Sequence, residues 1–326
     1  MVDRAIRFVP QWGRPDDPAR GGHEPFHESE HFSIRGHMLR VCLPVELAQR
    51  PLFTVADARA CGVAPVVLQR ALADGSVSRL KRGWYTAEKL RHPSERHRLR
   101  VEAELRDHPG TIASHHSAAV TLGLPLHRPN WTRVHLMRTR PGPAQSRPTV
   151  IIHQRVGEVA SLDAALVVAQ TALTCPISGL MAADHCLRTE QIVLDDVACW
   201  SLRLKNHVGH GHLPVVLRLA SGLRESPLES RTAITFDRWG WQLQPQFEVP
   251  GTRYRADARL RGTRVLIECD GRGKYDEPGA EHREKVREDD IRALDWEVVR
   301  VTSELLDERT TLLRRVKAAL ARAARR

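Results

Sequence analysis

One stretch of the chain decides how its C-terminal part folds: Arg264-Val265-Leu266-Ile267-Glu268-Cys269-Asp270-Gly271. Its apolar first half is typical of a buried strand, and the final glycine is a signal for the strand to end. Side chains two positions apart in a strand lie on the same side of a sheet, so Glu268 and Asp270 share a face. The stretch therefore predicts two carboxylates at the end of a buried strand.

The residues around this strand predict the element order αβββαβ, followed by a closing helix, over residues 224–326. Ser226 is the expected cap of the first helix, with Pro227 in its first turn. A tight turn joins the second and third strands into a hairpin, which brings Asp257 beside the two carboxylates of the stretch above. The expected elements are a helix at 226–238, strands at 241–249, 254–260 and 264–270, a helix at 281–294, a strand at 297–301 and a helix at 305–323.

Carboxylates that converge at one strand end repel one another unless a divalent cation or a proton neutralises them. Mg²⁺ or Mn²⁺ suits such an oxygen cluster, and the ion would polarise a phosphoryl oxygen and lower the pKa of a bound water. This chemistry is the hydrolysis of a phosphodiester. The candidate metal ligands are Asp257, Glu268 and Asp270. The alternative is that these carboxylates lie exposed on the hairpin and pair with Arg255, Arg259 or Arg264.

This region resembles the PD-(D/E)XK nuclease superfamily, and more narrowly its very-short-patch-repair-like endonuclease relatives in many bacteria. The matching segments occur in the same order, at 226–230, 254–257, 265–271, 287–294 and 296–301. The resemblance implies a restriction-endonuclease-like fold and a DNA endonuclease in which Asp257 and Glu268 bind the metal. Glu229 would be an auxiliary catalytic carboxylate, and Asp270 stands where the superfamily usually carries Lys.

The chain departs from the superfamily pattern because that Lys is absent. Lys274 in the following loop or Lys285 in the next helix is the candidate for the missing catalytic charge. Relatives also often carry a His shortly after the Asp-Gly pair, which this chain lacks. Arg283 and Arg287 lie one helical turn apart and are expected to face the scissile phosphate. The alternative for these arginines is a solvated helix face shared with glutamates.

Residues 51–86 predict a second compact unit, made of two helices and a hairpin. Thr54 is the expected cap of a helix over 55–60, which Gly62 ends. A helix at 66–73 and strands on either side of the turn at 81–83 follow. This is the order of a winged helix-turn-helix, in which the second helix enters the major groove and the wing touches phosphate. The expected DNA contacts are Gln69, Arg70, Arg79, Lys81 and Arg82. The alternative is a helical docking domain without nucleic acid.

The segments at 52–58, 62–63 and 80–85 resemble the N-terminal winged-helix domain of AbiEi-type antitoxins, whose recurrent feature is the wing that reads here Leu80-Lys81-Arg82-Gly83-Trp84-Tyr85. Members of that family repress their own toxin–antitoxin operons. The resemblance implies a DNA-binding module and a toxin–antitoxin or defence setting with a protein partner. Two functions follow: a DNA-binding, metal-dependent endonuclease, or a transcriptional regulator whose nuclease fold is catalytically silent.

Residues 87–223 predict an α/β middle region that resembles the body of the AbiEi-like family. Within it, packing is the expected role of His115-His116, because no acidic residue lies nearby in sequence to orient a nucleophile–base pair. The tract His207-x-x-His210-x-His212 is similar to a metal-binding tract. Its glycines favour a flexible loop instead. Residues 1–37 predict an unstructured extension upstream of a translation start at Met38.

Composition gives a formal net charge of +11, spread along the chain, which points to a polyanionic partner such as DNA. The six cysteines are scattered and form no C-x-x-C pair, so neither a zinc knuckle nor a disulfide framework is expected. No signal peptide or membrane segment is expected, and a reduced cytoplasm fits best. Action on RNA stays open, although the aromatic content of 5% gives no stacking platform.

Overall fold

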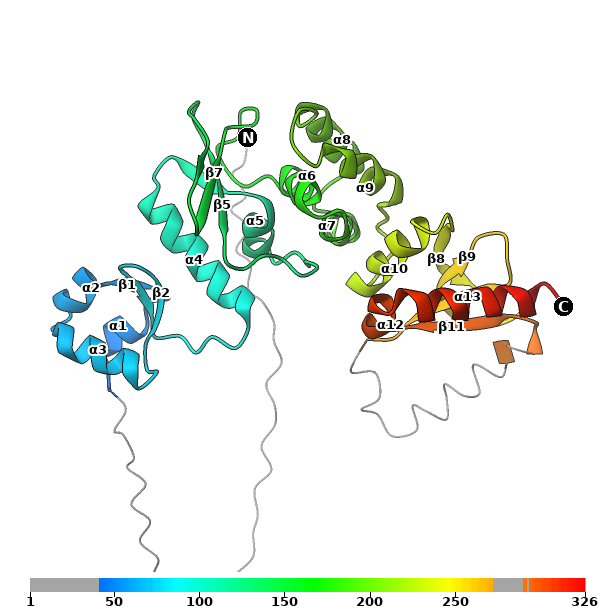
Figure 1. Cartoon of the computed structure of the whole chain (residues 1–326), viewed down its shortest axis with the longest axis horizontal. Coiled ribbons are helices and arrows are strands. Elements are labelled where there is room, and N and C mark those ends of the chain that lie inside the picture. Colours follow the sequence, from blue (N-terminus) through cyan, green and yellow to red (C-terminus); the bar gives the residue numbers. More distant parts are fainter. Residues whose placement is uncertain (1–40, 272–289, 292, 326) are drawn as a thin grey trace, which may run out of the picture. The chain divides into compact units, whose positions relative to one another are not determined.

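The computed structural model describes residues 41–271, 290–291 and 293–325 (Figure 1). The chain is mixed α+β, as expected, and its described parts contain three separate sheets. The expected extension 1–37, the start at Met38 and most of the expected helix 281–294 lie outside the described residues. No helix in the described ranges is both long and apolar enough to cross a membrane.

The unit nearest the N-terminus contains the two expected helices and the hairpin. Thr54 caps the first helix with a reciprocal arrangement, because its hydroxyl accepts the backbone N–H of Asp57 and the Asp57 carboxylate accepts the N–H of Thr54. Phe53 and Leu68 are buried in the core of this unit. The three strands form a sheet in the order β1-β3-β2. The elements are α1 (Val45–Ala48), β1 (Phe53–Thr54), α2 (Val55–Ala60), α3 (Pro65–Ala73), β2 (Ser78–Lys81) and β3 (Trp84–Thr86).

The middle of the chain holds the largest core cluster, built around the nearly all-buried helix α6. Gly179 of α7 lies so close to α6 that a Cβ there would stand 2.5 Å from the Cβ of Ala172. The four strands pair in the order β4-β5-β7-β6, with β5 and β7 parallel. The elements are α4 (Pro93–Asp107), β4 (Thr111–Ala113), α5 (His115–Thr121), β5 (Val134–Arg138), β6 (Gln145–Ser146), β7 (Val150–His153), α6 (Ala164–Thr174), α7 (Pro176–Arg188), α8 (Leu194–Arg203), the 3-10 turn η1 (His210–His212) and α9 (Leu213–Leu219).

The C-terminal part is a four-stranded sheet in the order β11-β10-β9-β8, in which β10 and β11 are parallel and the other neighbours antiparallel. Ile267, Val299 and Leu312 are buried in one core on its helix-covered side. The expected helix 305–323 is instead two helices that meet at Glu308, where ψ is 59°. The elements are α10 (Pro227–Asp237), β8 (Leu243–Glu248), β9 (Arg255–Leu260), β10 (Val265–Cys269), β11 (Glu297–Val301), α12 (Ser303–Asp307) and α13 (Arg309–Ala323).

Candidate nucleic-acid interface and carboxylate site

Helix α3 presents the two side chains that the sequence assigns to DNA. Leu68 and Ala71 are buried on one side of the helix, while Gln69 and Arg70 are exposed. Pro65 occupies the first turn, where its missing N–H costs no hydrogen bond. The exposed pair is therefore available to a partner that approaches α3 from solvent.

The hairpin β2–β3 carries the other three residues expected to contact DNA, and these residues differ in their exposure and ion pairing. Arg79 and Arg82 are exposed. The Lys81 ammonium instead lies 2.6 Å from Glu104 Oε2 and 2.8 Å from Asp107 Oδ2, both on α4. Two carboxylates thus compensate the charge of Lys81. It stays a predicted DNA contact, with less free charge to offer than the arginines.

A second hydrogen bond ties the hairpin to α4. The indole N–H of Trp84 donates to Asp107 Oδ1 over 3.0 Å. Burial acts to raise the pKa of the Asp107 carboxyl, but the hydrogen bonds from Lys81 and Trp84 outweigh burial and lower the pKa below its usual value. The hairpin is therefore fixed to α4 through a carboxylate that stays ionised.

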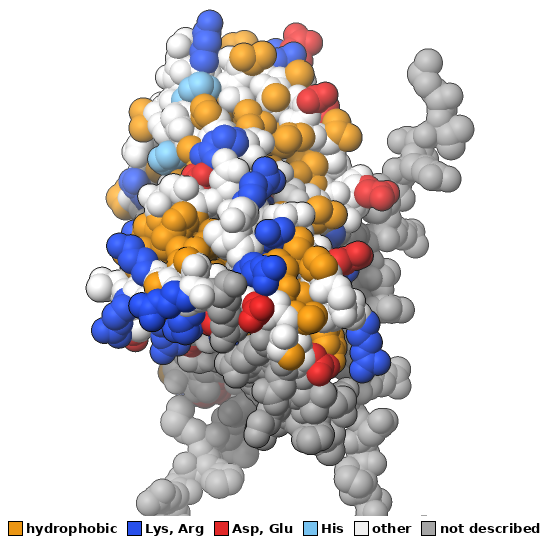
Figure 2. Space-filling view, turned by 90° about the vertical axis from the view of Figure 1, so that its right-hand side faces the viewer, with side chains coloured by type: hydrophobic (Ala, Val, Ile, Leu, Met, Phe, Trp, Pro, Cys, Tyr) orange, Lys and Arg blue, Asp and Glu red, His pale blue; other side chains and the backbone are white. Residues whose placement is uncertain are grey.

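Figure 2 shows how charge is distributed over one face of the molecule. Lys and Arg side chains lie at many places on this face, with Asp and Glu between them and hydrophobic side chains exposed among them. The positive charge of this face is therefore spread, as the composition predicts.

Asp257 lies where the pairing of two strands stops. The antiparallel ladder between β9 and β10 has its last pair at Ile267 and Ala258. Two residues beyond Ile267, the backbone N–H of Cys269 donates to Asp257 Oδ2 over 2.6 Å. The carboxylate of Asp257 thus replaces a backbone acceptor, and its position is set by the adjacent strand. Glu268 precedes this N–H in β10 and is partly buried, as is Asp257.

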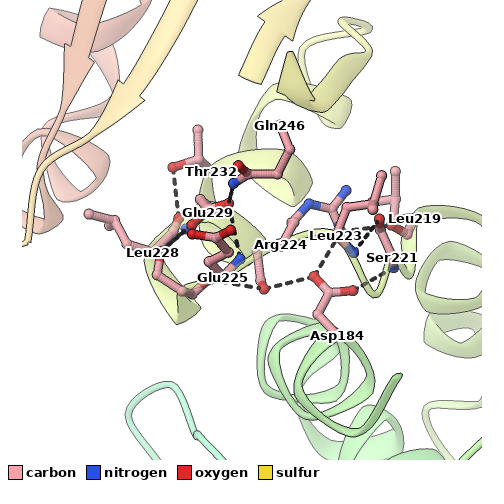
Figure 3. Close-up of polar contacts among 12 residues, drawn as sticks. Asp184, Leu219, Ser221, Leu223, Arg224, Glu225, Leu228, Glu229, Thr232 and Gln246 are labelled. Carbon is pink, nitrogen blue, oxygen red and sulfur yellow. Dashed lines mark hydrogen bonds and ion pairs between the residues drawn. The ribbon is translucent and has the colours of Figure 1, made fainter. Parts of the chain in front are cut away.

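Glu229 is held in the first turn of α10 (Figure 3). Its Oε1 accepts the Ser226 hydroxyl at 2.8 Å, and its Oε2 accepts the Gln246 amide at 2.9 Å and the backbone N–H of Glu225 at 3.2 Å. Burial raises the pKa of the Glu229 carboxyl and the Asp257 carboxylate adds to the rise, while these hydrogen bonds oppose it. Glu229 is therefore a preorganised, buried acid close to Asp257.

Glu229 and Asp257 line the same small cavity, together with Arg224, Thr232 and Cys269. Burial raises the pKa of the Cys269 thiol, and the carboxylates of Asp257, Glu229 and Glu268 raise it further. Two of the predicted carboxylates, Glu229 and Asp257, thus line one small cavity with a buried thiol.

Asp270 follows the last residue of β10 and contacts β11. Its backbone N–H donates to the carbonyl of Val301 over 2.9 Å, and its Oδ2 lies 4.0 Å from Arg300 Nη1. Both contacts are with β11, on the far side of β10 from Asp257. Asp270 therefore lies near an arginine, as the alternative expects. That arginine is Arg300 and not Arg255, Arg259 or Arg264.

The three predicted metal ligands do not form a group of close ligand atoms. Among the described residues, the group of three or more His, Cys, Asp or Glu side chains with ligand atoms all within 4.8 Å contains only histidines. Two carboxylates can still suffice for Mg²⁺, which keeps several waters, so Asp257 and Glu268 remain a predicted pair. The predicted residues Lys274, Lys285, Arg283 and Arg287 lie outside the described residues.

The pair His115-His116 and the tract 207–212 differ in their surroundings. His115 and His116 are both buried, which fits the expected packing role. In the tract 207–212, His212 Nδ1 lies 3.1 Å from the carbonyl oxygen of Ala172, and His210 Nε2 lies 3.4 Å from the Ser201 hydroxyl. The tract supplies no group of three close ligand atoms within the described part of the chain.

A buried ion pair near the cavity has no signal in the sequence (Figure 3). Asp184 of α7 and Arg224 are 2% and 6% exposed, and Arg224 Nη1 lies 2.7 Å from Asp184 Oδ2. The Ser230 hydroxyl and the backbone N–H of Ser221 each donate to the same carboxylate at 2.7 Å. Because the partners are 40 residues apart, no local pattern connects them.

Comparison with known proteins bears on the N-terminal unit. Residues 43–87 match the family model described as transcriptional regulator, AbiEi antitoxin. No curated protein matches the chain significantly. Among solved structures, the crystal structure of the RV2827C protein from Mycobacterium tuberculosis matches 52% of this chain and 72% of its own, with 14% identity and a TM-score of 0.33. The unit that contains α2, α3 and the β2–β3 hairpin is thus similar to AbiEi antitoxin regulators, as the sequence predicts.

Proposed function

We propose that the chain is a DNA-binding transcriptional regulator of the AbiEi antitoxin type, in which residues 51–86 act as a winged helix-turn-helix. The observation that carries this proposal is the family match over residues 43–87. The matched unit exposes Gln69 and Arg70 on one helix and basic side chains on the following hairpin. Helix α3 would contact base edges, and the hairpin would contact phosphate.

The role of the hairpin can be tested by the salt dependence of DNA binding. We would measure binding of the full chain to the DNA upstream of its own gene by fluorescence anisotropy at several salt concentrations. Each lost phosphate contact should reduce the slope of log K against log salt by about 0.9. The double variant Arg79→Ala/Arg82→Ala should therefore lose about 2 units of slope. The matched control is Arg140→Ala, which removes an exposed arginine outside the unit. A slope in the double variant equal to that of the control would refute the wing assignment.

A second candidate function is hydrolysis of phosphodiester bonds in DNA by the C-terminal part. The observation that favours it is the placement of Asp257 beside Glu229 and on the strand next to Glu268. Oxygen donors of this kind suit Mg²⁺ or Mn²⁺, which would activate a water and stabilise charge on the phosphate. Asp257 and Glu268 would hold the ion, and Glu229 would hold or release a proton at the edge of the cavity.

The nuclease candidate is tested by incubating supercoiled plasmid with the full chain and Mg²⁺ or Mn²⁺. Cleavage that disappears in Glu268→Gln and persists in Glu248→Gln would support it, because Glu248 is an exposed glutamate of the same sheet. The absence of cleavage by the wild type, with DNA binding intact, would leave the regulator as the function of the chain.

A further inference from the structure

Three histidines from three elements meet on one side of the sheet in the middle of the chain. His135 lies on β5, His153 lies on β7, and His115 is the first residue of α5. The parallel pairing of β5 and β7 sets Met137 opposite His153, so these two residues share a face of the sheet. His135 is two positions before Met137 in β5 and therefore lies on the same face as His153. The rings of His115 and His153 stack with their centroids 4.1 Å apart.

The spacing of these rings is close to that of a metal site. One ligand nitrogen from each of the three histidines lies within 4.8 Å of the other two. His135 Nδ1 and His153 Nε2 are 3.0 Å apart. Two imidazole nitrogens bound to one tetrahedral Zn²⁺ at about 2.0–2.1 Å stand about 3.4 Å apart. To bind one ion, His115 and His153 would turn out of their stack, so that a nitrogen of each points at the metal.

His115 carries an observation that packing alone does not explain. It is 6% exposed, and its Nδ1 lies 3.1 Å from the Ser114 hydroxyl. Its other ring nitrogen makes no hydrogen bond to any residue in the described ranges. This nitrogen is therefore available to a ligand. The backbone φ of His115 is also +52°, a strained value of the kind found at functional sites.

Neighbouring side chains hold the backbone of two of the three histidines, His115 and His135. The Ser117 hydroxyl accepts the backbone N–H of His135 over 2.9 Å and also lies 2.9 Å from His97 Nε2. The Gln170 side chain accepts the backbone N–H of His115 over 3.3 Å. These bonds fix the backbone positions from which the two imidazoles project. Burial lowers the pKa of all three imidazoles, which favours the uncharged form that binds metals.

We propose that His115, His135 and His153 form a three-histidine binding site for a borderline divalent transition metal, with Zn²⁺ as the natural occupant. Three imidazoles leave the fourth tetrahedral position open to water or to a small ligand. No carboxylate belongs to the group of ligand atoms, so the bound ion keeps its full charge of +2 and is a strong Lewis acid. Hard cations such as Mg²⁺ are excluded by an all-nitrogen donor set.

The test uses the metal-free full-length chain, titrated with Zn²⁺ in competition with a chromogenic chelator and with Co²⁺ as an optical probe. The expected result is one Zn²⁺ per chain and a Co²⁺ visible spectrum typical of four-coordinate nitrogen and oxygen ligation. His153→Gln should weaken binding at least tenfold, because glutamine keeps a polar side chain but is a poor ligand. His135→Gln serves the same purpose if His153→Gln does not fold. The matched control His185→Gln, on α7 and outside the cluster, should bind as the wild type does.

Several outcomes would overturn the proposal. They are the absence of saturable binding, equal affinity of His153→Gln and the wild type, and an equal loss in His185→Gln. Binding that is abolished by alkylation of the exposed Cys42 and Cys199, with thiolate bands in the Co²⁺ spectrum, would place the metal on the cysteines instead.

Discussion

Replacing Arg224 by methionine removes the cation from the buried ion pair with Asp184 while keeping an unbranched side chain of similar reach. The carboxylate would stay where it is, with its two remaining donors from Ser230 and the backbone of Ser221. The variant therefore leaves a carboxylate that is 2% exposed without its counter-charge, and it also removes the hydrogen bond from Arg224 Nη1 to the carbonyl of Leu219.

The size of the effect follows from burial. Removing one partner of a buried pair usually costs about 3–5 kcal/mol, because the other charge is left in a poorly polarisable surrounding. The two retained donors offset part of this loss, so we expect about 3 kcal/mol. Burial already raises the pKa of Asp184, and loss of Arg224 raises it further. The folded state then binds a proton that the unfolded state releases, so the stability of the variant falls as pH rises through the raised pKa.

The assay is urea denaturation of wild type and variant, followed by circular dichroism at pH 5 and pH 8. The deficit of the variant should be larger at pH 8. Arg218→Met is the control, because Arg218 pairs with Asp237 at the surface and is 52% exposed. It should cost less than about 1 kcal/mol. A deficit for Arg224→Met that matches this control, or one that grows toward acid pH, would refute the reasoning.

Three further predictions concern stability. Thr54→Ala removes the capping box of α2 and should cost about 1 kcal/mol in urea denaturation; an unchanged midpoint would contradict the role of the cap. Gly179→Ala places a methyl 2.5 Å from Ala172 and should destabilise by about 1–3 kcal/mol; a variant as stable as the wild type would show that α6 and α7 can separate freely. Burial lowers the pKa of His97 to about 4. The contribution of neutral His97 to the free energy of unfolding is therefore present above about pH 6.5 and is lost as pH falls toward 4, by up to about 3 kcal/mol. The slope of stability against pH in this range should be shallower in His97→Gln, and an equal slope would exclude His97 as its source.

Local rules predict the elements whose causes lie within a few residues. Thr54 and Ser226 cap their helices through side-chain bonds to residues three positions on, so a short pattern is enough to find them. The apolar run before Glu268 is likewise sufficient to predict β10. The break at Glu308 has no local signal, because the amphipathic pattern of α12 continues into α13 without a proline or glycine.

Features that depend on the tertiary fold were not predictable in the same way. The ion pair of Asp184 and Arg224 joins residues that nothing in the sequence relates. The cluster of His115, His135 and His153 draws one residue from each of three elements, so its spacing along the chain resembles no ligand motif. The carboxylates are partly predictable. The hairpin between β9 and β10 predicts that Asp257 lies next to β10. The contact of Asp270 with Arg300 depends instead on β11, which pairs with β10 from a distant part of the chain.

The attachment of the β2–β3 hairpin to α4 has a consequence for association with DNA. A free hairpin would have to lose conformational entropy when it settles on the backbone of the duplex. Here Lys81 and Trp84 hold the strands against α4 before any partner arrives. In the proposed complex with DNA, such preorganisation would raise affinity by reducing the ordering that accompanies binding, and the exposed arginines would meet phosphates at a fixed separation. Whatever Lys81 itself contacts, it would thus improve recognition through the shape of the hairpin that it maintains.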